Sequence, residues 1–249
     1  MFFKRYGRQW VGRFHNLSSY SKCIHGFSTR QGGVSAPPFD SLNMGFNTED
    51  TPALVTVNRE RLLQKLHVSE ACLAIPGQIH GNTVRTAGSP GQYPDTDALI
   101  TKENNVALMI QVADCVPVFL YDPAVPCIGL VHAGWRGSVE NITRRAVEAM
   151  IRDLKADPKT LMACIGPSIG PDCYQVGREV QAEFDKKYIA GGNLDLWACN
   201  RDQCREAGIP DSHILISGIC THCNPAFFFS NRTSGGRTGR MMAVMMLHV

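Results

Sequence analysis

The segment 106–137 constrains the fold most strongly, because apolar residues of high β propensity fill most of it. Short apolar runs of this kind, bounded by turn signals, are typical of buried strands. We predict three such strands, at 106–112, 116–121 and 127–131. Asp122-Pro123 marks the turn between the second and the third. The three strands should therefore lie at the centre of the fold.

A cysteine and a histidine stand beside these strands, where the apolar runs are interrupted. Cys115 lies between the first two strands, and His132 follows the third, at the start of a glycine-rich turn. His80 is a further candidate, in Gln78-Ile79-His80-Gly81 on a strand-like segment at 74–84. Small residues follow both histidines and leave room beside the imidazole rings. Cysteine and histidine at neighbouring strand ends can form a nucleophile–base pair or bind a soft metal.

Three nitrogen and sulfur ligands with an open fourth position are typical of a catalytic zinc site. Such a metal would activate a water molecule or orient an anionic oxygen. Spacing alone leaves two alternatives open, because a Cys–His hydrolase would show the same residues, and a lone histidine in an apolar segment is more often part of the core. Asp114 directly precedes Cys115, and an aspartate is costly to bury for a purely structural reason. The segment around Cys115 is therefore a candidate functional site.

Strand-like and helix-like patterns are interleaved along the rest of the chain, which predicts a single α/β domain over residues 1–249. Residues 1–23 form an N-terminal extension of that domain. The pattern is too irregular for a barrel, and it contains no internal repeat or linker. We predict helices at 54–66, 138–154, 178–188 and 194–207, and further strands at 98–101, 161–165, 214–219 and 241–249.

Charge and composition argue against several kinds of partner. The net charge is +3 and no dense block of lysine and arginine occurs, so nucleic acid is not an expected partner. No apolar run reaches the roughly 18 residues that a membrane helix needs. Residues 1–13 lack the apolar core of a secretory signal, so we expect a cytoplasmic protein without a membrane partner.

Ten cysteines are many for a chain in which no disulfide framework is expected. Several lie inside apolar runs, where cysteine acts as a small apolar residue. Cys220-Thr221-His222-Cys223 has the C-x-x-C spacing of a metal site, and Cys199 and Cys204 lie upstream. A structural zinc bound by these four cysteines is an alternative. It is disfavoured because helical residues five apart point roughly 140° away from each other.

Several motifs occur in the same order as in one known protein family. The motifs are Ser28-Thr29-Arg30-Gln31-Gly32-Gly33-Val34-Ser35, Gln78-Ile79-His80-Gly81, Asp97-Ala98-Leu99-Ile100-Thr101, Ala113-Asp114-Cys115-Val116-Pro117, Val131-His132-Ala133-Gly134-Trp135-Arg136-Gly137 and Ile165-Gly166-Pro167-Ser168-Ile169-Gly170. In these motifs the chain resembles the YfiH family, also called the laccase-domain, polyphenol-oxidase-like or peptidoglycan-editing-factor family. The resemblance extends from about Ile24 to the end of the chain, and the His-Ala-Gly-Trp-Arg-Gly block is highly specific.

The resemblance implies a layered α/β fold in a single domain, with a mixed β-sheet core. This fold would be shared distantly with the catalytic domain of cytotoxic necrotizing factor, a toxin deamidase that uses Cys and His. The resemblance also implies a zinc site formed by the histidine of Gln-x-His, the cysteine of Ala-Asp-Cys and the histidine of His-Ala-Gly-Trp. Here these are His80, Cys115 and His132, which would also be the catalytic residues. Copper is the less favoured metal.

The activity that the resemblance implies is phosphate-dependent cleavage of purine nucleosides. Adenosine, inosine, guanosine or methylthioadenosine would yield the base and a ribose 1-phosphate, and adenosine deamination would accompany the cleavage. The expected partners are therefore small molecules, namely nucleosides and phosphate, and the oligomeric state stays open. Candidates for binding substrate are Arg30, Asn43, Asp114 and Arg136, of which Asp114 is also a candidate acid or base.

Two positions depart from the family pattern. Gln175 stands where the family usually has the glutamate of Cys-Tyr-Glu-Val, and Thr233 stands where it usually has a second arginine. The second departure removes a cation from the C-terminal tail, although Arg237 and Arg240 could replace it. An anion-binding role of that tail therefore cannot be carried over from the family unchanged.

Three other functions stay open from the sequence. The first is a copper-dependent phenol oxidase, for which no second histidine cluster of a multicopper centre is visible in the sequence. The second is a cysteine amidase that edits peptidoglycan precursors, with Cys115 as nucleophile and His132 as base. The third is a partner-binding module without catalytic activity, which the small residues around the Cys and His side chains argue against.

Overall fold

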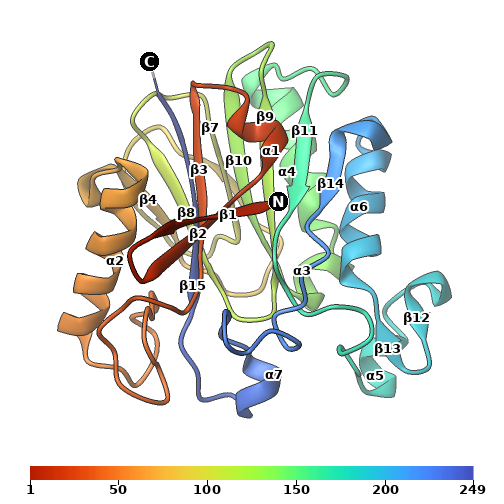
Figure 1. Cartoon of the computed structure of the whole chain (residues 1–249). Helices are drawn as coiled ribbons and strands as arrows, with labels where there is room; N and C mark the ends of the chain where they lie inside the picture. Colours follow the sequence, from red (N-terminus) through yellow and green to blue (C-terminus); the bar gives the residue numbers. More distant parts are fainter. Residues whose placement is uncertain (249) are drawn as a thin grey trace.

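Two β-sheets stacked face to face form the centre of the computed structural model, which describes residues 1–248 (Figure 1). Parallel and antiparallel pairs occur in both sheets, which confirms the predicted α/β fold with a mixed β-sheet core. The seven-stranded sheet has the spatial order β1 (Phe2–Tyr6), β2 (Gln9–Arg13), β3 (Cys23–Ser28), β15 (Met241–Leu247), β8 (Ala107–Val112), β4 (Leu73–Pro76), β6 (Gly91–Tyr93). The six-stranded sheet has the order β14 (Ile214–Ile216), β11 (Met162–Ile165), β9 (Val116–Asp122), β10 (Cys127–Ala133), β7 (Ala98–Thr101), β5 (Val84–Thr86).

The central strands are buried on both faces. In β8, Leu108 and Ile110 point into the core between the sheets, whereas Ala107 and Met109 point to the opposite side. Side chains alternate along a strand, so a strand that is covered on both faces needs an uninterrupted apolar run. Every residue of β9, β10 and β15 is buried, which explains the continuous apolar runs of the sequence.

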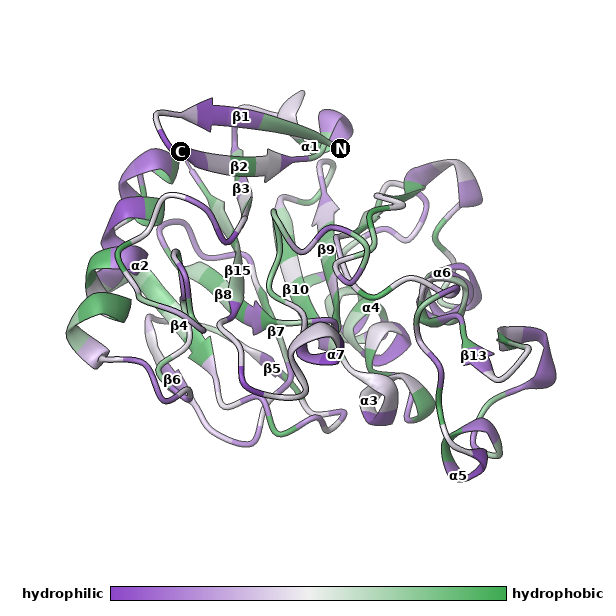
Figure 2. Cartoon of the chain, turned by 60° about the horizontal axis from the view of Figure 1, so that its bottom comes forward, coloured by the Kyte–Doolittle hydropathy of each residue, from purple (hydrophilic) through white to green (hydrophobic). Residues whose placement is uncertain are grey.

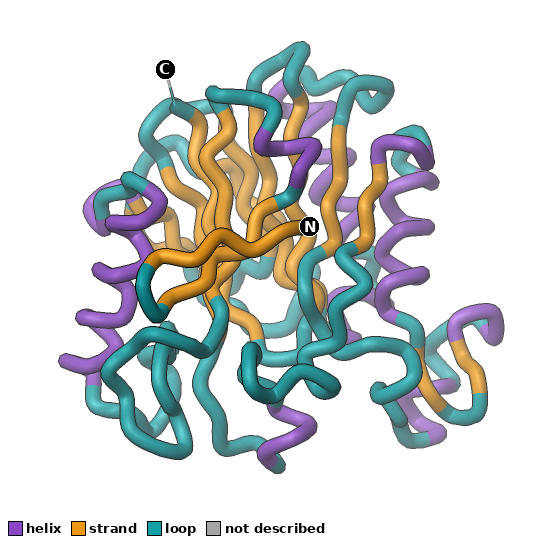
Figure 3. The backbone as a smooth tube through the Cα atoms, in the orientation of Figure 1, coloured by secondary structure: helices purple, strands orange, loops and turns teal. Residues whose placement is uncertain are grey.

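Helices cover the outer face of each sheet (Figure 3). Helix α2 (Pro52–Leu66) packs its leucines against the seven-stranded sheet. Helices α4 (Ile142–Leu154) and α6 (Leu196–Glu206) cover the six-stranded sheet. The order of layers is therefore helix, sheet, sheet, helix, and Figure 2 shows hydrophobic segments in the strands between them.

The remaining elements are short. No helix in residues 1–248 is long and apolar enough to cross a membrane. The short elements are α1 (His15–Ser18), α3 (Trp135–Val139), α5 (Arg178–Gln181), α7 (Asn231–Ser234), the 3₁₀ helices η1 (Glu70–Cys72), η2 (Lys186–Tyr188) and η3 (Asp211–His213), and the paired strands β12 (Ile189–Ala190) and β13 (Asn193–Leu194).

Two predicted helices are wrong in their extent. The helix predicted at 138–154 is interrupted at Asn141, whose φ of 60° cannot continue an α-helix, so α3 and α4 are separate. The helix predicted at 178–188 stops at Gln181. The Asp185 side chain then accepts a hydrogen bond from the Lys187 amide and caps the separate η2 turn.

Three predicted strands also need correction. The strand predicted at 74–84 ends at Pro76, because Gln78 and His80 have φ angles of 48° and 61°, far from the extended region. The strand predicted at 214–219 ends at Ile216. The predicted last strand is observed as β15 as far as Leu247, and Val249 lies outside the described residues.

The order of strands brings the interrupted runs together at one end of the six-stranded sheet. Strands β9 and β10 are antiparallel neighbours, and Val116 pairs with Ala133. Strand β7 pairs with the other edge of β10, so that Ala98 lies opposite Val131. The last residues of β10 therefore lie beside Cys115, which directly precedes β9, and beside Asp97, which directly precedes β7.

Candidate metal-binding active site

Cys115, His132 and His80 meet at this end of the six-stranded sheet. The sulfur of Cys115 and the ring nitrogens of the two histidines offer one ligand atom each, and these atoms all lie within 4.8 Å of one another. The centroids of the two imidazole rings are 4.9 Å apart, and the ring planes are inclined by 75°. His132 is buried on β10, Cys115 is half-buried, and His80 is exposed. The three side chains therefore form one group that is open on the side of His80.

His80 reaches the group from the loop between β4 and β5. The Gln78 side chain fixes this loop to β8, because its amide donates to the Gln111 carbonyl at 2.7 Å and accepts from the Gln111 N–H at 2.8 Å. The left-handed backbone at Gln78 and His80 turns the chain back toward the sheet end. A single exposed histidine on a short loop is thereby held in one place.

Asp97 connects two of the three side chains and was not among our predicted site residues. Its Oδ1 bonds His132 Nδ1 at 2.8 Å and accepts the His80 N–H at 3.0 Å. Its Oδ2 accepts the N–H groups of Ile79 and Gly81 at 3.1 and 2.8 Å. A polar residue immediately before a fully buried strand was the signal in the sequence that could have identified it.

In the protein without metal, the electrostatics favour a charged pair of the Cys115 thiolate and the protonated His132. Burial by itself would raise the pKa of Cys115, but the adjacent imidazoles of His132 and His80 outweigh it and lower that pKa to about 6. Burial would lower the pKa of His132, yet Cys115 and Asp97 raise it to about 9. The pKa of Asp97 is lowered, because the hydrogen bond from His132 outweighs the effect of burial. The lowered pKa therefore favours the thiolate of Cys115, the form that binds metals and attacks as a nucleophile.

This donor set fits a soft or borderline metal ion such as zinc or copper. It offers one thiolate and two imidazoles, which leave a fourth position open in a tetrahedral site. Asp97 occupies Nδ1 of His132, which fixes the ring and leaves the other nitrogen for a ligand bond. Gly134 keeps the space clear, since a Cβ there would lie 3.0 Å from the His80 ring and 3.3 Å from the Cys115 sulfur.

Two cavities adjoin the group and share His80, Ala113, Cys115 and Asn231. The first has a volume of about 410 Å³, within the usual range of roughly 300–1,000 Å³ for ligand pockets. The second has about 280 Å³. The first is lined mainly by polar side chains (Asn47, Gln78, Gln111, Asn231 and Arg240), and the second includes Trp135, Arg136, Tyr174 and Arg232.

Arg136 and Asp114 both line the second cavity, but Arg136 is exposed and Asp114 is buried. The guanidinium of Arg136 stacks on the Trp135 ring at 4.2 Å and is exposed. Asp114 is buried, and its carboxylate accepts hydrogen bonds from Thr221 Oγ1 at 2.6 Å, from Ser230 Oγ at 3.0 Å and from the Arg232 N–H at 2.7 Å. Asp114 thus anchors two distant segments beside Cys115, and its oxygens are already engaged.

The structure does not bring Arg30 and Asn43 to the Cys–His group. Arg30 forms an ion pair with Asp40 at 3.1 Å and lines a separate cavity with Arg5 and Arg8. Asn43 is fully buried, and its Oδ1 accepts from the Gly45 and Arg240 N–H groups, both at 2.9 Å. Asn43 therefore organises the loop that holds Arg240, the arginine that does line the first cavity.

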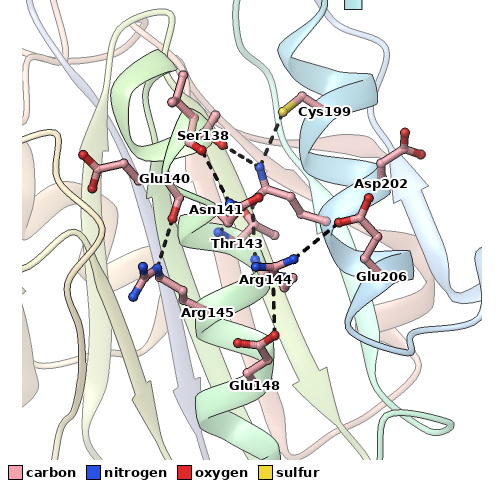
Figure 4. Close-up of polar contacts among 12 residues, drawn as sticks. Ser138, Glu140, Asn141, Thr143, Arg144, Arg145, Glu148, Cys199, Asp202 and Glu206 are labelled. Carbon is pink, nitrogen blue, oxygen red and sulfur yellow. Dashed lines mark hydrogen bonds and ion pairs between the residues drawn. The ribbon is translucent and has the colours of Figure 1, made fainter. Parts of the chain in front are cut away.

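The disfavoured alternative, a zinc bound by four cysteines, is not formed. Cys199 and Cys204 are buried on α6, and Cys199 faces the polar contacts between α3, α4 and α6 in Figure 4. The sulfurs of Cys220 and Cys223 meet Cys173 instead. Cys199 and Cys204 therefore lie in the core on α6, apart from Cys220 and Cys223.

The family follows from comparison with known proteins. A family model described as multi-copper polyphenol oxidoreductase laccase matches residues 24–248, and the chain belongs to this family. The predicted membership of the YfiH, or laccase-domain, family is thereby confirmed.

Relatives and solved structures agree with this membership. The chain is 36% identical over 241 residues to purine nucleoside phosphorylase YlmD of Bacillus subtilis, covering 88% of this chain and 87% of the relative. It is 39% identical over 231 residues to a purine nucleoside phosphorylase of Deinococcus radiodurans, covering 90% and 88%. The crystal structure of the hypothetical protein YfiH from Bacillus licheniformis superimposes with a TM-score of 0.91 at 32% identity over 98% of both chains. YlmD from Geobacillus stearothermophilus gives 0.90 at 31% identity over 99% of both.

Proposed function

We propose that this chain is a zinc-dependent purine nucleoside phosphorylase whose active site is formed by the two cavities beside His80, Cys115 and His132. The observation that carries the proposal is the presence of a soft-metal donor set and an arginine in one cavity of about 410 Å³. The names of relatives that align with about nine-tenths of this chain point to the same reaction.

Arg240 is our candidate for binding phosphate. It lines the first cavity and forms no ion pair with a carboxylate in residues 1–248. Its guanidinium is held by the carbonyls of Thr238 and Gly239 at 2.8 and 3.0 Å. A planar guanidinium that still has free N–H groups can bind two oxygens of one phosphate.

The purine would occupy the second cavity, beside Tyr174 and Trp135. Aromatic rings offer stacking surfaces to a flat base. Displacement at C1′ of the ribose needs the phosphate and the purine on opposite sides of that carbon. This arrangement is supported by two cavities that share His80, Cys115 and Asn231 in their linings.

In the proposed reaction a phosphate oxygen forms the bond to C1′ while the bond from C1′ to the purine nitrogen breaks. The electron pair of that bond leaves with the base, which takes up a proton, and ribose 1-phosphate is the second product. Arg240 stabilises and orients the phosphate, and Asp97 keeps His132 and His80 in position. A zinc ion held by His80, Cys115 and His132 would supply Lewis acidity at this point.

Adenosine deamination is proposed for the same site. Here water takes the place of phosphate and attacks C6 of adenine, and ammonia leaves. This reaction needs the base to bind with C6 toward the donor set, and it does not need the arginine that binds phosphate. The two reactions should therefore respond differently to phosphate.

The test is incubation of metal-quantified protein with adenosine, with and without phosphate. Adenine and ribose 1-phosphate should appear only with phosphate, and inosine should appear in both cases. Cys115→Ala should lose both activities together with the zinc held by His80, Cys115 and His132, whereas Cys72→Ala, a half-buried cysteine on η1, should keep them. Equal release of adenine with and without phosphate would identify a hydrolase and refute the proposal.

A cysteine hydrolase is the second candidate, because Cys115, His132 and Asp97 are arranged as nucleophile, base and orienting carboxylate. Such an enzyme could act as an amidase on peptidoglycan precursors. It would keep its activity after chelation of the metal and lose it on alkylation of Cys115. Full activity of the metal-free protein on an amide would favour this candidate over the phosphorylase.

A further inference from the structure

A second group of soft ligands lies outside the site described above. The sulfur atoms of Cys173, Cys220 and Cys223 all lie within 4.8 Å of one another. Cys173 is 50 positions from Cys223 in the sequence, and their sulfurs are 3.3 Å apart. In residues 1–248, this group and the group of His80, Cys115 and His132 are the two in which three or more such side chains converge.

The backbone around these cysteines is built to hold the sulfurs in place. The Gly170 N–H donates to the Cys220 sulfur at 3.2 Å, and N–H groups aimed at sulfur stabilise a thiolate. The Asn224 side chain donates to the Cys220 carbonyl at 2.8 Å and closes the C-x-x-C turn. A Cβ at position 170 would lie 3.2 Å from the Cys220 Cβ, so glycine permits this approach.

The distances fit a shared ligand. Zinc–sulfur bonds of about 2.3 Å in a tetrahedral site place neighbouring sulfurs roughly 3.8 Å apart. Three thiols grouped at 3.3–4.8 Å need only small side-chain movements to reach that arrangement. Cys223 is exposed, which leaves a path for the ion and a fourth position for water.

We propose that Cys173, Cys220 and Cys223 form a second zinc-binding site, which holds two segments of the chain together. The ion ties the loop 166–174 to the turn 220–224. The two segments are already joined at Ser168, whose carbonyl accepts from the Thr221 N–H at 2.9 Å and whose N–H donates to the Ile219 carbonyl at 3.3 Å. Three thiolates and a water complete a tetrahedral site, and soft thiolates select zinc over harder cations. This site is separate from the three residues proposed for catalysis.

The position of this zinc site links it to the wall of the active-site cavities. Tyr174, which lines the second cavity, directly follows Cys173. Thr221, between Cys220 and Cys223, donates to Asp114 at 2.6 Å, and Asp114 directly precedes Cys115. A metal at the three cysteines would therefore reduce the motion of both the Tyr174 wall and the segment that carries Cys115.

The test measures zinc per chain after Zn²⁺ is added and the excess is removed by gel filtration. In the Cys115→Ala background, which disables the first site, we expect one zinc per chain. Cys115→Ala/Cys223→Ser should bind none, and Cys115→Ala/Cys72→Ser should still bind one. If the site of His80, Cys115 and His132 does not bind zinc, the wild-type chain also binds a single zinc ion, and Cys223→Ser alone removes it. Failure of the proposed catalytic zinc can therefore be told apart from failure of the three-cysteine site.

A spectroscopic measurement identifies the ligands. Co²⁺ bound to the Cys115→Ala variant should show an intense sulfur-to-cobalt absorption that Cys223→Ser abolishes. Hydrogen exchange of segments 166–175 and 219–230 should become faster when the zinc is removed, whereas exchange in α2 should not change. A folded Cys115→Ala variant that binds no zinc would overturn the proposal, and so would a Cys173–Cys223 disulfide in the freshly purified protein.

Discussion

Replacement of Asp97 by asparagine should weaken metal binding, because one carboxylate serves four donors. Oδ1 bonds His132 Nδ1 and the His80 N–H, and Oδ2 accepts from the Ile79 and Gly81 N–H groups. An asparagine of the same shape has one oxygen and one NH₂ group. Whichever way the amide is turned, two of the four donors face an NH₂ group that cannot accept from them.

The two orientations have different consequences. With the oxygen toward His132, the Ile79 and Gly81 N–H groups lose their partner, and the loop that carries His80 loosens. With the NH₂ toward His132, the ring must accept at Nδ1 and carry its proton on the other nitrogen, which blocks that nitrogen as a metal ligand. A buried donor without a partner costs about 1–3 kcal/mol. We therefore expect a loss of about 2–6 kcal/mol in the free energy of unfolding in the first case, for two donors, and a 10–100-fold loss of zinc affinity in either case.

The assay combines urea unfolding of the metal-free protein with zinc titration against a competing chelator at neutral pH. Both are done in the Cys223→Ser background, so that the titration reports the site of His80, Cys115 and His132. Asp95→Asn is the matched control, since Asp95 lies in the same turn, is exposed, and has a φ of 52° that asparagine tolerates. The reasoning would be refuted if Asp97→Asn kept its zinc affinity within about twofold and its free energy of unfolding within about 0.5 kcal/mol of the control, the usual range for surface substitutions.

Three further predictions concern stability and substrate binding. Burial lowers the pKa of His25 to about 4, so the unfolded chain binds more protons between pH 6.5 and 4. The contribution of neutral His25 to the free energy of unfolding is therefore complete above pH 6.5 and is lost as the pH falls to 4. Urea unfolding should show a loss of up to about 3 kcal/mol over this range, and His25→Asn should largely remove this pH dependence. Gly33→Ala should destabilise by about 1–3 kcal/mol in urea, because its Cβ would overlap the Ser41 carbonyl oxygen, whereas Gly88→Ala, with open space around it, should not. Arg240→Met should raise the KM for phosphate at least tenfold and leave inosine formation nearly unchanged. The control is Arg237→Met, because Arg237 pairs with Glu49 at the surface. An unchanged KM for phosphate in Arg240→Met would contradict the phosphate assignment.

The sequence by itself determined the central strands and the proximity of Cys115 to His132. A strand covered on both faces must be apolar throughout, so β8, β9 and β10 are visible as continuous runs. Consecutive antiparallel strands place the start of one beside the end of the next, and β9 and β10 do so here. The adjacency of Cys115 and His132 thus follows from chain order and local pattern.

Only the tertiary structure decided which distant side chains join them. Asp97 reaches His132 through the register of β7 on β10, and His80 arrives on a loop whose left-handed residues no strand pattern predicts. The same holds for Arg240, which takes the place at the cavity that we had expected for Arg30. Apolar periodicity reports how each segment is buried, but contacts between segments depend on register, loop conformation and the packing of layers, and these are set by the chain as a whole.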